Sequence, residues 1–242
     1  MDNYAILYED EDILVANKVA PLPVQPEKTK DPSLQDLLRA ELAACPGSSD
    51  EPFLEAAHRI DRRASGAIVF AKTRRALETL SADFRERRID KQYVACVERE
   101  PVPSAGRLEN RLVWDKRSNV VRAFPVESAA EAAERKKPAE LAVLEYSLAS
   151  ASERYWFLDI KLITGKHHQI RAQLSRAGFP IKGDIKYGAR RTNSNGLIML
   201  HARKLSLVQP RTRENLEIVA PFPASDALWA AYVPQDENLG AQ

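Results

Sequence analysis

Cysteine is scarce in this sequence, with two residues in 242. Cys45 and Cys96 do not form a CxxC pair, and so few thiols support neither a disulfide framework nor a thiolate metal site. The sequence therefore favours a reducing compartment, the cytoplasm, and predicts that both thiols are buried as small apolar side chains.

Long apolar runs are missing as well. No stretch reaches the roughly 20 apolar residues of a membrane-spanning helix. The acidic N-terminus, MDNYAILYEDED, lacks the basic and then apolar layout of a signal peptide. We therefore expect no membrane partner.

The sequence also lacks the signatures of bound cofactors and metals. Neither a Walker A motif nor a GxGxxG motif is present, so a nucleotide cofactor has no support. No two of the four histidines are four residues apart, as the ligands of a helical zinc site are. His167 and His168 are predicted to point to different sides of a helix. We expect no metal and no cofactor.

What is abundant is charge, and it is unevenly distributed. The 36 basic and 34 acidic residues give a net charge of +2. Residues 1–57 carry −8 and residues 214–242 carry −5, whereas residues 58–92 carry +5 and residues 161–213 carry +11. Two basic segments in a near-neutral protein indicate a face for a polyanion such as nucleic acid, unless folding spreads them over every face.

Three helices are expected from apolar periodicity and capping signals. Residues 31–45 predict an amphipathic helix with Asp31 as N-cap and Pro32 at its first position. Thr73 is the expected N-cap of a second helix. A third is expected to open at residues 164–165 and to close at Gly178.

Strands are expected to outnumber helices and to adjoin one another. Two apolar runs around the acidic turn at residues 9–12 predict a hairpin. Further strands are predicted at 66–72, 91–99, within 107–125 and 140–164, at 197–207 and at 214–220. This order predicts an α+β fold with a mixed, mostly antiparallel central sheet flanked by helices and loops. We expect a single domain over residues 1–242, with residues 126–138 as a short exposed helix or a mobile insertion.

The stretch HRIDRRASG, residues 58–66, places one aspartate among three arginines. Nearby positive charge favours the ionised form of Asp61, which suits nucleophilic attack or electrostatic stabilisation better than proton donation. Only one carboxylate is present, whereas ordinary glycoside hydrolysis uses a pair. From the residues alone, a structural ion pair of Asp61 with its neighbours is the favoured interpretation.

The motifs together resemble the RluA family of RNA pseudouridine synthases. HRIDRRASG is similar to the family motif HRLDxxTSG, and KQYVACV is similar to its KxYxAxV strand. TGKHHQIRAQLSRAGFPIKGDIKYG resembles the stretch GRTHQIRxHLxxxGxPIxGDxxYG, and LHARKLSL and APFP follow in the family's order. The resemblance runs from about residue 4 to about residue 223, with Ala64, Lys166 and His167 among the departures.

The resemblance implies an RNA pseudouridine synthase that acts by base flipping and without a cofactor. It implies that Asp61 is the catalytic carboxylate, that Arg171 pairs with it, and that Tyr93 stacks on the target uracil. Arg59 resembles the arginine that fills the gap left by the flipped base. Whether Asp61 attacks C1′ or drives a glycal route is left open.

Other substrate-binding residues are expected around this centre. Arg62, Arg63 and Lys186 are candidate phosphate contacts, although each alone is as well explained as a solvated side chain. His168 and His201 match family positions and are expected to order the site by hydrogen bonding.

The resemblance leaves the RNA itself open. Structured ribosomal RNA and transfer RNA are both possible, and a monomer is the simplest expectation. An N-terminal S4-type RNA-binding domain, which many relatives carry, is not expected. Two other functions remain: a non-catalytic RNA-binding protein that retains the fold, and a hydrolase that releases a free base.

Overall fold

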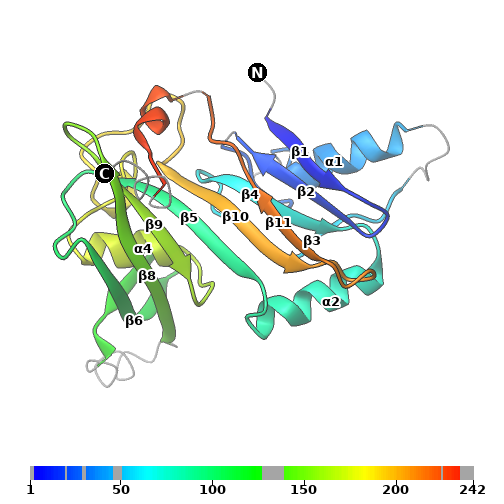
Figure 1. Ribbon diagram of the computed structural model, residues 1–242, viewed down its shortest axis with the longest axis horizontal. Helices are drawn as coiled ribbons and strands as arrows, with labels where there is room; N and C mark the ends of the chain where they lie inside the picture. The colour runs from blue at the N-terminus through cyan, green and yellow to red at the C-terminus, as the bar shows by residue number, and fades with distance from the viewer. Residues whose placement is uncertain are drawn as a thin grey trace, which may run out of the picture. The chain divides into compact units, whose positions relative to one another are not determined.

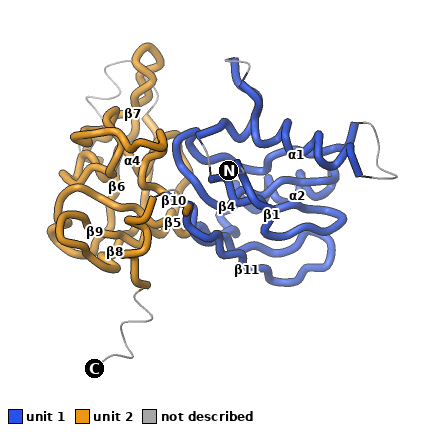
Figure 2. The backbone as a smooth tube through the Cα atoms, turned by 90° about the horizontal axis from the view of Figure 1, so that it is seen from above, with its two compact units in different colours: residues 1–91, 201–223 blue, residues 92–200, 224–242 orange. Residues whose placement is uncertain are grey.

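A computed structural model gives the arrangement of most of the chain. It describes residues 3–19, 21–28, 31–45, 51–126, 139–224 and 226–234. The predicted insertion lies almost entirely outside the described residues. Figure 2 shows two compact units, residues 1–91 with 201–223 and residues 92–200 with 224–242. The expected single domain stays a prediction, because compactness does not show whether either unit folds alone.

The first unit is built on a mixed sheet. Its strands are β1 (Tyr4–Glu9), β2 (Ile13–Lys18), β3 (Glu55–Ala56), β4 (Ser65–Ala71), β10 (Leu200–Val208) and β11 (Asn215–Val219). β1 pairs with β2, β2 with β4, β3 with β4 and β10 with β11, all antiparallel, while β4 and β10 are parallel. The hairpin and every other strand of this unit except β3 were predicted from the sequence.

Helices cover both faces of this sheet. Helix α2 (Arg74–Arg85) packs Ala76 and Leu80 against a cluster that includes Val15 and Val69. Helix α1 (Leu34–Ala43) packs Leu34 and Leu38 against the alternate residues, such as Ala16 and Ile68. Because successive strand residues point to opposite faces, β2 and β4 are buried throughout and read as continuous apolar runs.

The N-caps of α1 and α2 can be compared with the residues predicted for them. Thr73 caps α2 as predicted, accepting a hydrogen bond from the Ala76 amide. The prediction for α1 was wrong by two residues. Ser33, not Asp31, is its N-cap, in a capping box in which Ser33 and Asp36 each accept the other's backbone N–H. A reciprocal box satisfies two amides, so it outcompetes a cap that satisfies one.

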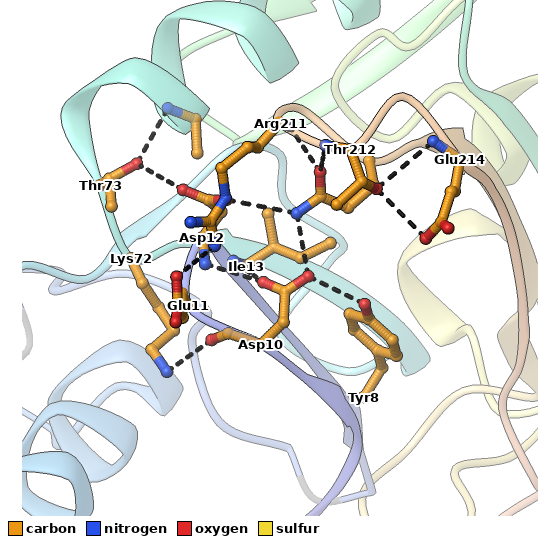
Figure 3. Close-up of polar contacts among 12 residues, drawn as sticks. Tyr8, Asp10, Glu11, Asp12, Ile13, Lys72, Thr73, Arg211, Thr212 and Glu214 are labelled. Atoms are coloured by element: carbon orange, nitrogen blue, oxygen red, sulfur yellow. Dashed lines mark hydrogen bonds and ion pairs between the residues drawn. The ribbon is translucent and has the colours of Figure 1, made fainter.

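A polar network ties the β1–β2 turn to the β10–β11 turn (Figure 3). Gln209, which is 2% exposed, donates to the carboxylates of Asp10 and Asp12. Its side-chain oxygen accepts from the backbone amides of Arg211 and Thr212. The Arg211 guanidinium pairs with Asp12 at 2.6 Å. The acidic turn is therefore a structural feature of this unit.

We expect Gln209→Ala to lower the free energy of unfolding by about 2–3 kcal/mol, because two half-buried carboxylates and two backbone amides lose their partner. Arg211→Ala is the control, since its exposed ion pairs are worth at most about 1 kcal/mol. Urea denaturation of both variants measures the difference. A smaller loss for Gln209→Ala than for Arg211→Ala would contradict the assigned importance of the buried amide.

The second unit is an antiparallel sheet with one helix against it. Its strands are β5 (Asp90–Val97), β6 (Ala105–Asp115), β7 (Val120–Phe124), β8 (Glu140–Ala151) and β9 (Trp156–Leu162). The order is β5-β9-β8-β6-β7, and every one of these pairs is antiparallel. Helix α4 (Gln169–Arg176) buries Ala172 against Leu112, Val121 and Ala142. The short helices η2 (Ile185–Tyr187) and η3 (Ala227–Ala231) complete the unit.

Helix α4 begins later than predicted. Its N-cap is His168, in the left-handed conformation at φ 50°, and not residue 164 or 165. His167 and His168 therefore precede the helix, and their rings stack at 3.8 Å, so the prediction that they point to different sides of a helix was wrong. Gly178, at φ 97°, follows the C-cap Ala177 as predicted.

These units confirm the predicted α+β fold class with a mixed, mostly antiparallel sheet (Figure 1). Cys96 is buried, which raises the pKa of its thiol, but Cys45 is exposed and was wrongly predicted as buried. Among the described residues, no helix has the length and apolar character needed to cross a bilayer.

Candidate active site

The carboxylate loop lies in the first unit, between β3 and β4. Asp61 is half-buried, and its carbonyl accepts a hydrogen bond from the Ala64 amide at 3.0 Å, which closes the turn that presents the side chain. Arg59 and Arg63 flank it and are exposed. Within the described parts of the chain, neither of these arginines forms an ion pair or a side-chain hydrogen bond. They are the two cations of this loop best placed to meet an outside anion.

A buried lysine lies behind the loop. Lys18, at the end of β2, is 0% exposed and donates to the Arg62 carbonyl at 2.9 Å. Burial lowers the pKa of Lys18 to about 7, although the Asp61 charge opposes that shift by favouring the ammonium form. Lys18 therefore holds the backbone of the loop and places a titratable charge near Asp61. No motif or periodicity in the sequence singled out Lys18.

The lowered pKa of Lys18 predicts a pH dependence of stability. Between pH 7 and about 10.5 the unfolded chain holds a proton on Lys18 that the folded chain has lost, so stability rises with pH in this window. One proton corresponds to a slope of at most about 1.4 kcal/mol per pH unit. We expect Lys18→Met to remove this part of the slope. Denaturation of the wild-type protein and of Lys18→Met from pH 6 to about 10 tests this prediction. Equal slopes of the free energy of unfolding against pH would contradict the assignment of Lys18 as a buried lysine.

Arg62 has a different surrounding from the other arginines. Its guanidinium pairs with Asp31 at 2.6 Å and with Glu27 at 3.8 Å, and it donates to the Pro21 carbonyl. These contacts tie the 21–31 loop to the carboxylate loop. They favour a positioning role over the phosphate contact expected from the sequence.

The chain leaves the loop directly into a strand. Ser65 and Gly66 already belong to β4 and pair with His201 and Ala202 of β10. Gly66 has φ 118°, and a Cβ there would lie 2.4 Å from the Ala202 backbone, so only glycine fits.

His201 fixes this strand start. Its Nδ1 hydrogen-bonds the Ser65 hydroxyl at 2.8 Å, and its Nε2 lies 3.1 Å from the Ala220 carbonyl. Since a carbonyl only accepts, Nε2 carries the proton and donates. Burial lowers the pKa of His201 to about 4, so it is neutral at physiological pH. It orders the backbone beside the carboxylate loop.

His58 opens the motif but is not placed for acid–base chemistry. Its Nε2 accepts a hydrogen bond from the Val69 amide at 3.1 Å, and its ring packs on Phe84 at 4.7 Å. Burial, reinforced by the nearby Lys91 charge, lowers the pKa of His58 to about 3. A neutral imidazole that accepts from a strand amide fixes the start of the carboxylate loop against β4.

The guanidinium of the site lies in the second unit, on α4. Arg171 is 6% exposed and forms a bidentate ion pair with Asp184, which is 1% exposed. The distances are 2.6 Å from Nε and 2.8 Å from Nη2. A bidentate pair fixes the plane of the guanidinium and leaves Nη1 outside the pair. Asp184 was missed by the sequence reasoning, although it lies in the quoted stretch GFPIKGDIKYG.

Tyr187 completes the surroundings of Arg171. The guanidinium carbon lies 4.7 Å from the centre of its ring. The Tyr187 hydroxyl accepts from the Val121 amide and hydrogen-bonds His168 Nδ1, both at 2.8 Å. His168 therefore holds the Tyr187 ring beside the Arg171 guanidinium. Tyr187 was also missed, and its place in the same stretch was the available signal.

Two other predicted site residues, Tyr93 and Lys186, also lie in the second unit. Tyr93 lies on β5 opposite Ile160 of β9 and is 7% exposed. Lys186 lies in η2, is exposed, and donates to the Asn119 carbonyl at 3.1 Å. In the sequence, Lys186 directly precedes Tyr187 and follows Asp184 by two residues.

A buried glutamine holds the turn that precedes α4. Gln169 accepts from the Thr164 hydroxyl at 2.8 Å and from the Lys166 amide at 3.0 Å, and it donates to the Val143 carbonyl. These bonds allow His168 to keep its uncommon left-handed backbone, a conformation that surrounding contacts must impose. The turn thereby sets where α4 starts and which way Arg171 points.

The comparisons with known proteins agree with one another. Residues 12–176 match the RNA pseudouridylate synthase family. The ribosomal large subunit pseudouridine synthase C of Vibrio vulnificus is 32% identical over 223 residues, which cover 90% of this chain and 65% of that protein. The dual-specificity RNA pseudouridine synthase RluA of Escherichia coli K12 is 32% identical over 235 residues, covering 91% and 98%. The structure of human RNA pseudouridylate synthase domain containing 4 matches with a TM-score of 0.70 and 26% identity, covering 91% and 89%.

The α+β fold and the order of these motifs along the chain identify the class of protein as an RNA pseudouridine synthase, which is an isomerase. The chain belongs to the RNA pseudouridylate synthase family. It is similar to the Escherichia coli enzyme over nearly that protein's whole length, whereas it spans just under two thirds of the Vibrio relative.

Proposed function

We propose that the chain isomerises specific uridines of structured ribosomal or transfer RNA to pseudouridine, with Asp61 as the catalytic carboxylate. The observation that carries the proposal is the Asp61 loop itself, an HRID turn supported by a buried lysine and flanked by exposed arginines. The names of the relatives, a large-subunit ribosomal enzyme and a dual-specificity one, support these RNA classes.

The reaction needs no redox or energy input. The N1–C1′ bond of the uridine breaks, the base turns, and a C5–C1′ bond forms. The proton leaves C5 and N1 gains one, so atoms balance without a cofactor. Asp61 stabilises or attacks C1′ while the base is detached, and Tyr93 stacks on the uracil and helps to move the C5 proton.

Arg171 is proposed as the partner that pairs with Asp61 and orients it. The bidentate pair with Asp184 supports this role because it fixes the guanidinium plane before substrate arrives. His168, through Tyr187, and His201, through Ser65, are proposed to position these groups. Arg171, His168 and His201 are proposed to act by their position, and none of them needs to change its protonation state during turnover.

Base flipping requires a side chain to fill the emptied stack, and we assign this to Arg59. It is exposed, two residues before Asp61 in sequence, and without an internal ion pair among the described residues. Arg63 and Lys186, both exposed, are proposed as phosphate contacts. Arg62 is proposed to position the loop, given its pairs with Asp31 and Glu27.

The experiment that tests this function is pseudouridine mapping across all RNAs of a strain that lacks the gene. We expect specific sites in ribosomal or transfer RNA to be lost and to be restored by the wild-type protein. An unchanged map in which the purified protein still binds RNA would favour a non-catalytic RNA-binding protein. Release of free uracil in vitro would favour a hydrolase.

A cytoplasmic monomer with one catalytic domain is part of the proposal. The scarcity of cysteine, with both thiols free, supports a reducing compartment. Light scattering of the purified protein tests the oligomeric state, and a mass of about twice the 27.1 kDa of the chain would overturn the monomer.

A further inference from the structure

Trp114 is a large aromatic side chain that the fold leaves on the surface. It lies near the end of β6, next to the β6–β7 turn, and is 45% exposed. Its ring lies 5.1 Å from the ring of His167, at an interplanar angle of 58°. A half-exposed tryptophan beside another ring lies outside the core and presents an aromatic face at the surface.

A continuous series of rings connects Trp114 to Arg171. The rings of His167 and His168 stack at 3.8 Å, and His168 meets the Tyr187 ring edge-on at 5.5 Å. The Arg171 guanidinium lies over Tyr187. All five residues belong to the second unit, so the exposed indole lies at the outer end of a stack whose inner end is the proposed catalytic arginine.

Asn119 holds the edge of this stack in place. Its side-chain oxygen accepts from Trp114 Nε1 at 3.1 Å and lies 3.4 Å from His167 Nε2. Its carbonyl accepts from Lys186 Nζ at 3.1 Å. Because the only hydrogen-bonding group of the indole is already engaged, Trp114 offers its ring face rather than a hydrogen bond.

The surroundings of the indole are cationic. Lys116 Nζ lies 5.7 Å from the centre of the Trp114 ring, and Lys186, Arg117 and Arg122 are exposed on the neighbouring segments. The one acidic side chain of the turn, Asp115, is half-buried and accepts from the Arg117 amide. A π-face bordered by cations is the combination that binds an unpaired base and its phosphate.

We propose that Trp114 is a stacking site for an unpaired base of the RNA substrate, near the uridine that is modified. Lys116 and Lys186 would contact the phosphates on either side of that base. The inference rests on the proposed action on RNA and adds a recognition site to it. Stacking is tolerant of base identity, so this site would select for a single-stranded segment rather than for a sequence.

Kinetics on the bulk RNA of the deletion strain test the site. We expect Trp114→Ala to raise KM for pseudouridine formation by about 5- to 30-fold with kcat nearly unchanged, since a stacked base contributes about 1–2 kcal/mol. Trp114→Phe should retain most of the wild-type KM because it keeps a π-face. Val219→Ala, at a residue 46% exposed in the first unit, is the control for the loss of an exposed apolar side chain.

Fluorescence separates this inference from the proposed function. We expect short single-stranded oligouridylate and oligoadenylate to quench the wild-type emission at low salt. The quenching should be much weaker in Trp114→Phe, which retains Trp156 and Trp229. If the wild-type protein forms no pseudouridine in any RNA, the proposed function fails, while quenching that depends on Trp114 still supports the stacking site. Equal quenching in the two proteins, or an unchanged KM in Trp114→Ala, overturns it.

Discussion

Asp61→Asn is expected to lower the rate of pseudouridine formation to less than about one thousandth of the wild-type rate. Asparagine keeps the size and shape of the side chain but removes the negative charge. A neutral amide neither attacks C1′ nor stabilises positive charge developing there. Quantifying pseudouridine in RNA from the deletion strain, after incubation with each protein, gives the measurement.

RNA binding and folding should survive this substitution. The loop is held by the Lys18 contact to the Arg62 carbonyl and by the Ala64 amide, neither of which uses the Asp61 carboxylate. Asp90→Asn, the same chemical change at an exposed strand position, is the control and should keep full activity. Turnover of Asp61→Asn at more than a tenth of the wild-type rate would rule out Asp61 as the catalytic group.

One further consequence of Asp61→Asn is measurable without substrate. The Asp61 charge favours the protonated form of Lys18, so its removal should lower the Lys18 pKa below about 7. NMR titration of the Lys18 side chain measures this shift directly. A shift in the expected direction would show that the two groups interact in the folded protein, independently of catalysis.

The elements of the fold were readable from the sequence because local signals and burial agree in them. Thr73 before an apolar stripe and Gly178 after one mark helix ends that the structure retains. The start of α1 was misplaced because Asp31 and Ser33 are both good caps, and only the reciprocal bond to Asp36 separates them. The start of α4 was misplaced because Gln169 and Thr164 hold a non-helical turn there.

The candidate site was readable only in part. Asp61 stands out as a single carboxylate among arginines, and Arg59 and Arg171 were assigned from the resemblance to the family motifs. Lys18, Asp184 and Tyr187 were missed because their importance comes from burial and from partners distant in sequence, which periodicity does not reveal. Arg62 is the reverse case, since its partners Asp31 and Glu27 come from a loop that no local pattern places beside it.

Arg171→Met is the second substitution with a large expected effect, and it acts on both stability and activity. It leaves the Asp184 carboxylate buried at 1% exposure without its bidentate partner. Removing one member of a buried pair costs about 3–5 kcal/mol. Arg107→Met is the control, because its pair with Glu145 is exposed and worth at most about 1 kcal/mol.

Activity should fall by at least about a hundredfold in Arg171→Met, which removes the group proposed to orient and stabilise Asp61. Lost stability could produce the same result, so the double variant Arg171→Met with Asp184→Leu decides between the two causes. Replacing both members of a buried ion pair by apolar side chains is often neutral for folding, and methionine packs well on the Tyr187 ring. We therefore expect urea denaturation to show most of the lost stability restored while the rate stays at least about a hundredfold low. Recovery of the rate together with stability would show that Arg171 serves the fold alone, and the proposed pairing with Asp61 would have to be abandoned.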